Sequence, residues 1–168
     1  MIPICNQPHR IEYMHRDKNL IPLSHQHQHT LALCVRLDRA IQSGNVDLGA
    51  WQAELQEQFE QEISPHFSVE EKKIFPAAAR FPELKPLVRQ LMIEHAILRG
   101  LFSRAAKHKL NVVQLERLVE NLASHIRKEE RDLFEGMQNL MEPKQLATMG
   151  EALEHVLSAA APECAMRK

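Results

Sequence analysis

Several residue types and patterns are scarce in this chain, and each scarcity excludes a class of structure. Only five of the 168 residues are Gly, and long stretches without Gly favour helices over a turn-rich β fold. The sequence holds no run of about 18 apolar residues, so no transmembrane helix and no membrane partner are expected. The N-terminus shows no charged-then-apolar signal pattern, so we expect a cytoplasmic protein.

Cysteine and net charge are also low. Cys5, Cys34 and Cys164 form no Cys-x-x-Cys pair, which argues against a disulfide framework and a zinc ribbon. The formal net charge is −1, which gives no support for nucleic-acid binding. Hydrophobic residues make up 44% of the chain and charged residues 26%, as in ordinary soluble globular proteins. At this length we expect one domain spanning residues 1–168.

Apolar residues recur at steps of three and four along most of the chain, and this period predicts amphipathic α-helices. We predict an all-α fold in which residues 24–141 form an up-down-up-down four-helix bundle. Residues 1–23 contain three Pro and are expected to form an N-terminal arm. Residues 142–161 are expected to form a short C-terminal fifth helix, with a frayed tail from Pro162.

Capping residues and prolines mark the expected ends of these helices. Gly44 is predicted to end the first helix. Pro65 falls inside the stripe of the second helix, which predicts a kink or the local loss of one backbone hydrogen bond. Residues that favour N-caps precede the first, second and fourth helices: Ser24, Asp47 and Asn111.

Histidine is unusually frequent, with ten residues, and it is the commonest metal ligand in proteins. Residues 66–75 and 125–134 repeat one pattern: His, Glu at +4, Glu at +5, an aliphatic residue at +8 and Phe at +9. Residues four apart lie one turn above each other on the same helix face. Each copy therefore points an imidazole and a carboxylate in one direction.

The phase of these residues is more informative than their presence, because each replaces a core position in an apolar stripe. Every one of the four predicted helices interrupts its stripe with a His. Burying imidazoles and carboxylates without partners would be costly, and a pair of metal ions would remove that cost by holding the Glu ionised and the His neutral. The sequence predicts a dinuclear metal site with six ligands: His27, His66, Glu70, His95, His125 and Glu129.

Three histidines compete for the ligand position on the first helix. His27 lies in phase with Leu31 and Cys34 and is favoured. His25 and His29 lie two residues to either side and should point elsewhere. The second Glu of each repeated pattern, Glu71 or Glu130, is expected to face solvent or to accept the other N–H of a ligand imidazole.

The chain resembles the hemerythrin-like (HHE cation-binding) proteins over about residues 22–141. The resemblance rests on an early-helix His within residues 23–31, the two His-x-x-x-Glu motifs, and Glu94-His95 on the third helix. It implies a non-haem di-iron site bridged by an oxo or hydroxo group and two carboxylates. It also implies a role for each residue: His66, His95, His125 and one first-helix His as terminal ligands, with Glu70 and Glu129 as bridges.

Two positions depart from the pattern of the oxygen-carrying hemerythrins. Those proteins have His-x-x-x-His on the third helix, whereas Arg99 stands four residues after His95 here. Their fourth helix has an Asp five residues after its His, whereas this chain has Glu129 at four. The set of four His and two Glu resembles instead the di-iron proteins linked to nitric-oxide stress and iron–sulfur cluster repair. Those usually carry a separate N-terminal domain with neighbouring cysteines, and this chain has only Cys5 in its arm.

Three functions follow from the resemblance. The first is a protein that binds or senses a small oxidant: O₂, NO or peroxide. The second is a di-iron enzyme of nitric-oxide or oxidative stress defence, which would need a redox partner. The third is non-redox metal binding or iron storage, because carboxylates and imidazoles do not choose among iron, zinc and manganese. The fifth helix offers a surface for a partner or for a homodimer.

Overall fold

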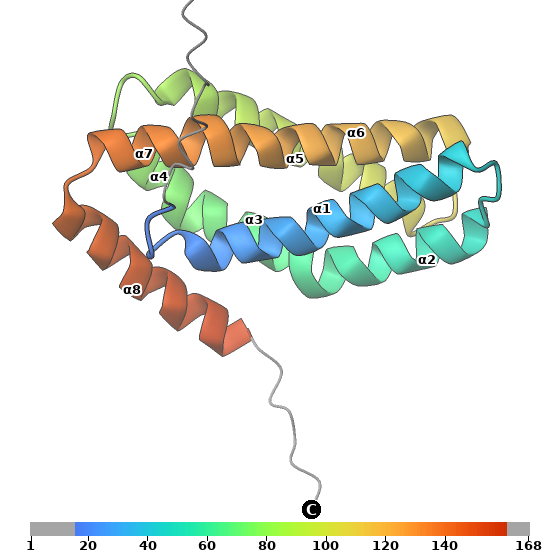
Figure 1. Cartoon of the computed structure of the whole chain (residues 1–168), viewed down its shortest axis with the longest axis horizontal. Coiled ribbons are helices and arrows are strands. Elements are labelled where there is room, and N and C mark those ends of the chain that lie inside the picture. The colour runs from blue at the N-terminus through green and yellow to red at the C-terminus, as the bar shows by residue number, and fades with distance from the viewer. Residues whose placement is uncertain (1–15, 161–168) are drawn as a thin grey trace, which may run out of the picture.

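In the computed structural model of the chain, residues 16–160 are described, and all regular secondary structure within that range is helical (Figure 1). The all-α prediction is confirmed. Most of the expected N-terminal arm falls on residues 1–15, and the expected tail falls on residues 161–168, so both lie outside the described range.

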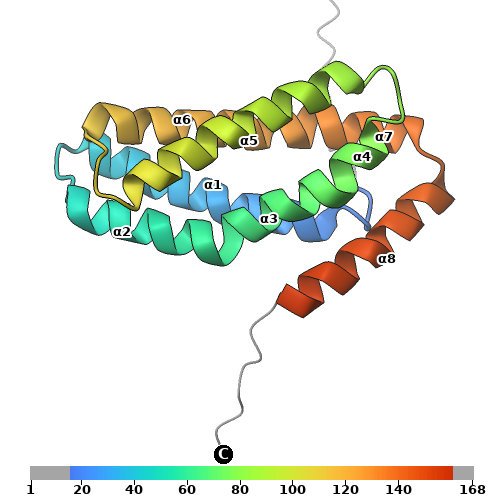
Figure 2. The same ribbon diagram turned by 180° about the vertical axis from the view of Figure 1, so that it is seen from behind.

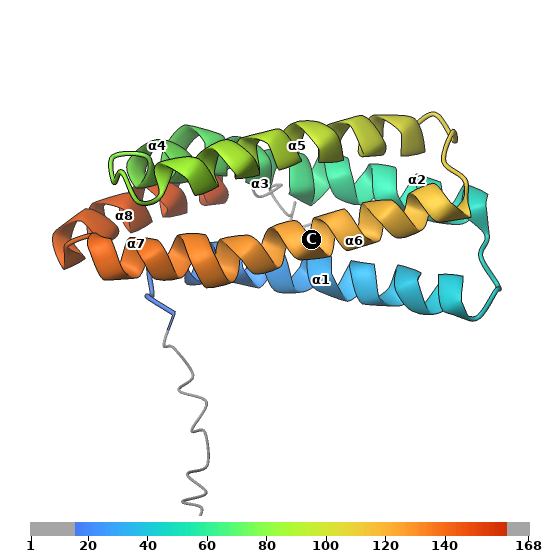
Figure 3. The same ribbon diagram turned by 90° about the horizontal axis from the view of Figure 1, so that it is seen from above.

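Four helical rods form the bundle, and two of them contain π-helical turns, labelled η. In Figures 1 and 2, successive rods run in opposite directions, and α1 packs against α6 while α5 packs against both α2 and α6. Figure 3 shows the second and third rods in one layer and the first and fourth in the other. The first and third rods are α1 (Ile21–Gln42) and α5 (Lys85–Ala105). The second rod comprises α2 (Leu48–Gln58), η1 (Phe59–Ile63), α3 (Ser64–Val69), η2 (Glu70–Ile74) and α4 (Phe75–Ala78). The fourth comprises α6 (Val112–Lys128), η3 (Glu129–Leu133) and α7 (Phe134–Leu140).

A fifth helix, α8 (Pro143–Ala160), turns back across one end of the bundle (Figure 1). It packs against α3 and η2, and Leu146, Met149 and Leu153 bury its inner face. Gly150 lets the segment before α1 approach closely, because a Cβ at that position would lie 2.2 Å from Asn19 Oδ1. This contact helps to fix α8 against the bundle.

Two of the three predicted N-caps are confirmed. The Asp47 carboxylate accepts the backbone N–H of Ala50 at 3.0 Å. Asn111 forms a capping box with Gln114, in which each side chain accepts the backbone N–H of the other residue. Gly44 follows the end of α1 with a φ of 70°, a left-handed conformation that glycine adopts without steric cost.

The prediction that Ser24 caps the first helix is wrong. The helix begins at Ile21, about one turn earlier, and Pro22 lies in its first turn, where the missing backbone N–H has no intrahelical partner to lose. The Ser24 hydroxyl instead donates to the carboxylate of Glu130 at 3.1 Å. The bundle therefore starts at residue 21 rather than 24.

The π-helical turns widen the second and fourth rods at three places. In each, a backbone N–H bonds to the carbonyl five residues earlier, as from Ser64 to Phe59 and from Phe75 to Glu70. Pro65 follows the first of these turns, and Figure 2 shows the rod bending where α2 gives way to α3. The predicted local disturbance at Pro65 is confirmed.

A polar layer divides the core into two apolar clusters. On α1 and α5, the residues of one cluster precede the polar position and those of the other follow it, whereas on the second and fourth rods Phe67, Val69 and Ile126 lie between the His and Glu positions. On α1, for example, Leu23 belongs to one cluster and Leu37 to the other, with His27 between them. On α5, Leu91 and Leu98 flank His95 in the same way. The bundle thus encloses its polar residues at mid-height.

Cys34 lies in one of these clusters on α1, and the side chain is 4% exposed. Burial raises the pKa of its thiol to about 11, and the reactive species is the thiolate. We expect iodoacetamide at neutral pH to alkylate Cys34 roughly 100-fold more slowly in the native protein than in urea. Mass spectrometry of the peptide that contains Cys34 measures both rates, and similar rates would contradict this burial.

Candidate metal centre

The structure brings all six predicted ligand residues together in one buried cluster. Each rod contributes one His, and the two rods with π-helical turns in this layer also contribute one Glu each. The six are His27 on α1, His66 and Glu70 on the second rod, His95 on α5, and His125 and Glu129 on the fourth rod. All six side chains are buried.

The cluster consists of two overlapping groups, and within each group the candidate ligand atoms lie within 4.8 Å of one another. Glu70 and Glu129 belong to both groups. A carboxylate that can reach two cation positions is a natural bridge between neighbouring metal ions. One group is His27, His66, Glu70 and Glu129, and the other is Glu70, His95, His125 and Glu129.

The two oxygens of each shared carboxylate face opposite pairs of imidazoles. Glu70 Oε1 lies 3.0 Å from His66 Nε2, while Glu70 Oε2 lies 3.4 Å from His95 Nε2. For Glu129, the distances are 3.2 Å from Oε2 to His27 Nε2 and 3.2 Å from Oε1 to His125 Nε2. Each side of the cluster therefore receives one oxygen from Glu70 and one from Glu129.

All four of these carboxylate oxygens are buried, and none has an aligned hydrogen-bond donor among the described residues. The surrounding imidazole nitrogens approach them without hydrogen-bond geometry, so the contacts are electrostatic. A buried carboxylate without a donor or a cation is strongly unfavourable. The donor set therefore fits a cation at each side of the cluster.

Each of the four imidazoles is oriented by an acceptor at Nδ1, on the side away from the cluster. Three of the acceptors are carboxylate oxygens and the fourth is the amide oxygen of Gln26. These oxygens accept hydrogen bonds, so the ring proton lies on Nδ1 and the Nε2 lone pair points inward. The Nδ1 distances are 2.6 Å from His27 to Glu130, 2.7 Å from His66 to Gln26, 2.8 Å from His95 to Glu71 and 2.9 Å from His125 to Glu94.

These acceptors form a ring around the bundle. Each stands next in sequence to a ligand of its own rod and contacts the His of the following rod: Gln26 to His66, Glu71 to His95, Glu94 to His125 and Glu130 to His27. A residue beside an inward-facing one is rotated by about 100° on a helix, so it faces the neighbouring rod. The ring was not predicted as a whole, because its pairs form between helices.

The inward nitrogens meet in pairs. His27 Nε2 lies 2.9 Å from His66 Nε2, and His95 Nε2 lies 3.0 Å from His125 Nε2. Because the Nδ1 protons are held by the outer acceptors, two lone pairs would face each other at these distances. A proton or a metal ion is needed between them, and a metal ion would satisfy the adjacent carboxylates as well.

The carboxylates of the cluster stabilise the protonated forms of two imidazoles, those of His27 and His125, when metal is absent. Burial alone would lower the pKa of His27, but neighbouring carboxylates, Glu129 foremost, hold it well above its usual value. The same opposition raises the pKa of His125 to about 9. Burial would raise the pKa of Glu70, but the imidazoles around it, with His66 foremost, hold it well below its usual value. An incoming metal ion must therefore displace protons from Nε2 atoms.

The three acidic acceptors are in turn held by cations. Arg16 Nη2 lies 2.8 Å from Glu130 Oε2, and Arg99 Nη1 lies 2.6 Å from Glu71 Oε1. Lys128 pairs with Glu94. Arg99, at the position where oxygen carriers have a further His, also lies over the ring of Phe67. It therefore supports the ring of acceptors and lies outside both candidate ligand groups.

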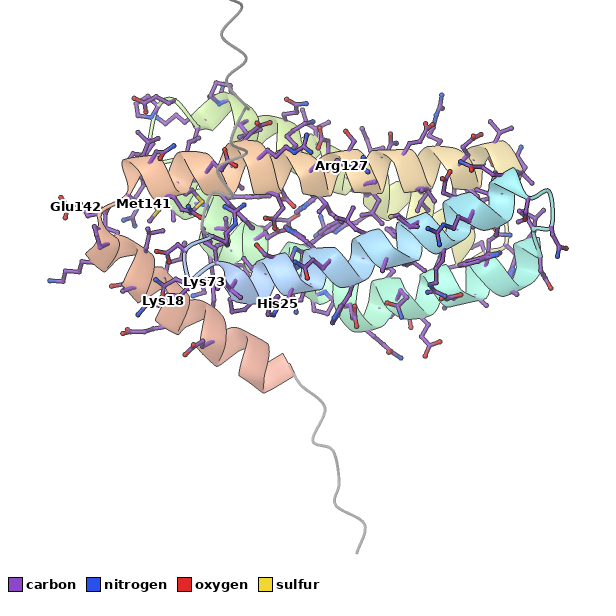
Figure 4. The ribbon with its side chains drawn as sticks, in the orientation of Figure 1. Lys18, His25, Lys73, Arg127, Met141 and Glu142 are labelled. Atoms are coloured by element: carbon purple, nitrogen blue, oxygen red, sulfur yellow. The ribbon has the colours of Figure 1, made fainter. Side chains whose placement is uncertain are left out.

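The remaining histidines of α1 lie outside the cluster. His27 is 2% exposed, whereas His25, labelled in Figure 4, and His29 are exposed to solvent. Of the three His, only His27 lies on the apolar face of α1, as its position in the stripe predicts. The identity of the metal ligands themselves stays a prediction.

Removing the charge of Glu130 is expected to weaken metal binding about 10-fold to 100-fold, because an ionised acceptor at Nδ1 makes the His27 imidazole a better ligand. The Glu130→Gln variant keeps an acceptor oxygen and removes the charge. Competition with a chelating dye measures the affinity. The matched control is Glu120→Gln, at an exposed position on α6, which should leave the affinity unchanged. Equal affinities of both variants would contradict the role of Glu130.

The fold and the cluster together define a helical bundle with a buried His/Glu cluster that could hold metal ions. The sequence model of the family described as "Hemerythrin HHE cation binding domain" matches residues 22–136, and the chain belongs to this family. The resemblance seen in the sequence is confirmed, and the matched range includes all six candidate ligands. Comparisons with curated proteins and with solved structures gave no match. Within the described residues, no helix is long and apolar enough to span a bilayer.

Proposed function

We propose that the cluster holds two iron ions, one in each group, and that the protein binds or senses a small oxidant, namely O₂, NO or peroxide. The observation that supports a pair of ions is the double membership of Glu70 and Glu129, whose four buried oxygens have no aligned donor in the described chain. The proposed ligands are His27, His66, Glu70, His95, His125 and Glu129, with the two Glu as bridges.

The donor set supports both the metal and its reactivity. Nitrogen and oxygen donors without thiolate suit iron, manganese and zinc, and the family resemblance favours iron. Two imidazoles and two shared carboxylates give each ion fewer protein ligands than an octahedral ion accepts, which would leave room for a small molecule. When bound, ferrous iron would donate electrons to an oxidant, whereas a redox-inert ligand would accept none.

The residues around the cluster exclude water from it. Phe67 stacks on His95 with ring centroids 3.8 Å apart. The Phe at +9 of each repeated pattern also contacts a ligand imidazole, with Phe75 5.2 Å from His95 and Phe134 5.6 Å from His27. A small apolar molecule can cross such a wall more readily than a hydrated ion, and this supports a gas, O₂ or NO, as the ligand.

A di-iron enzyme is the second candidate, and the observation that favours it is Arg99 at the position of a further His. With one protein ligand fewer, the site would retain a labile position for turnover, as in reduction of NO or breakdown of peroxide. A role in iron–sulfur cluster repair would belong to this class. Metal binding without redox chemistry, including iron storage, is the third candidate.

One experiment separates the three candidates. Protein loaded with ferrous iron without air is mixed in turn with O₂, NO and peroxide, and the near-UV and visible spectrum is recorded with and without an electron donor. Stoichiometric, reversible changes are the expected result for a sensor. Sustained consumption of NO or peroxide with the donor would indicate an enzyme. A spectrum unaffected by all three oxidants would contradict both redox functions, and zinc-loaded protein is the control.

A further inference from the structure

A pocket of about 490 Å³ lies between α8 and the stretch from η2 to the end of the second rod. Figure 4 labels three residues of its lining, Lys73, Met141 and Glu142, near the end of the bundle that α8 crosses. Its volume falls in the range of small-molecule sites, which are mostly apolar with a few polar groups. It lies outside both candidate ligand groups.

Cations dominate the polar part of this lining: Lys72, Lys73, Arg80 and Lys144, against one carboxylate, that of Glu142. All five side chains are exposed. Among the residues that the structure describes, none of the four cations forms a side-chain ion pair or hydrogen bond. This differs from the metal centre, where Arg99 and Lys128 are each paired with a carboxylate. The rim of the pocket thus offers unpaired positive charge.

The floor of the pocket is apolar. Met141 and Met149 are buried, and Phe81 is half-buried beside them. Methionine side chains are flexible and polarizable, and they adapt to ligands of irregular shape. An apolar floor below a cationic rim complements a molecule with one apolar end and one anionic end.

The geometry points to this pocket as a binding site for a small amphipathic anion, such as a medium-chain carboxylic acid. The hydrocarbon chain lies on Met141 and Met149, and the carboxylate meets Lys72 and Lys73. A single small molecule fits better than a protein partner, because a stable protein interface buries roughly 800 Å² on each side and this feature is a bounded pocket. The site does not depend on the proposed function of the metal centre.

Isothermal titration calorimetry of the metal-loaded full chain tests the site with decanoate as the probe. We expect one decanoate per chain, measured below its micelle concentration. Acetate lacks the apolar chain and decyltrimethylammonium has the opposite charge, so neither should bind measurably. Binding of decyltrimethylammonium as strong as that of decanoate would overturn the charge assignment. Absence of decanoate binding would overturn the site.

Two variants locate the binding. The Lys72→Gln/Lys73→Gln double variant should weaken decanoate binding about fivefold, the effect of two exposed ion pairs. The matched control, Lys107→Gln/Lys109→Gln, alters two exposed Lys between α5 and α6 and should bind as the wild type does. Ala152→Glu places a carboxylate in the lining and should abolish binding, with circular dichroism confirming the fold. An unchanged affinity of Ala152→Glu would show that decanoate binds elsewhere.

A free acid and a membrane lipid present the same chemistry, and vesicles distinguish them. When vesicles of anionic phosphatidylglycerol are sedimented, the protein should stay in the supernatant. The pocket takes a single hydrocarbon chain, and its cationic rim is too short to hold the protein on a membrane surface. Sedimentation with the vesicles that is lost in the Lys72→Gln/Lys73→Gln variant would overturn the assignment to a free acid.

Discussion

Glu129→Gln is expected to remove both metal ions from the protein, whereas His66→Gln is expected to remove about one. Glu129 belongs to both candidate ligand groups, and His66 belongs to one. Glutamine keeps the size of the side chain but loses the negative charge, and its amide nitrogen turns a donor toward a cation. Glu70→Gln should behave like Glu129→Gln for the same reason.

Elemental analysis of each purified variant gives the number of metal ions per chain. Circular dichroism should show that each variant keeps its helices. The matched control is Glu120→Gln, an exposed position on the same rod, which should retain the wild-type content. If Glu129→Gln lost no more metal than His66→Gln, the carboxylate would not bridge two ions.

Removal of the metal is expected to lower the melting temperature by roughly 15–30 °C. Ions present at about 1,000 times their Kd stabilise a fold by about 4 kcal/mol per site, and for a chain of this size 1 kcal/mol shifts Tm by about 2–4 °C. The physical cause lies in Glu70 and Glu129, whose buried carboxylates lose their cations. Differential scanning calorimetry before and after dialysis against a chelator measures the shift.

The Glu70→Gln/Glu129→Gln double variant separates loss of metal from general damage. It binds no metal in this account, so the chelator should not change its melting temperature. Without metal, it should be no more stable than the metal-free wild type, because the imidazoles lose the carboxylates that stabilise their protonated forms. A wild-type protein that lost its metal without a change in melting temperature would contradict a cation between the buried carboxylates.

The fold and the cluster were predictable because the His and Glu of each rod occupy the same helical face as its apolar residues. His27 illustrates this point, since it shares the stripe of Leu31 and Cys34, and His25 and His29 lie off that face. The error at Ser24 has a local cause. Pro22 looked like a helix breaker, but in the first turn it begins α1, and the Ser24 hydroxyl bonds to Glu130 on another rod.

The π-helical turns had a signal in the sequence that was not used. Inward positions 66, 70 and 74 step by four twice in succession, as do 125, 129 and 133, and each second step is a π-helical turn. An α-helix repeats every 3.6 residues, so consecutive steps of four drift off the face unless one turn is widened. On α5 the inward positions alternate steps of four and three, and no π-helical turn occurs there.

The ring of acceptors behind the imidazoles was only partly predictable. Glu71 and Glu130 follow the proposed bridges in sequence, which indicated that they contact a ligand His. Which His each one reaches depends on how neighbouring rods are rotated, and spacing within one rod does not determine that. Gln26 and Glu94 also stand next to a proposed ligand, His27 or His95, but they precede a His and lie outside the repeated His/Glu pattern that drew attention to Glu71 and Glu130.

The most direct test of the central claim is the iron content per chain of protein expressed with iron and purified without air. Two shared carboxylates between two pairs of imidazoles predict two iron ions per chain, with new absorption bands in the near-UV and visible range once air is admitted. Protein with a full complement of helices and no iron, or with one zinc ion and no spectral response, would contradict a di-iron centre.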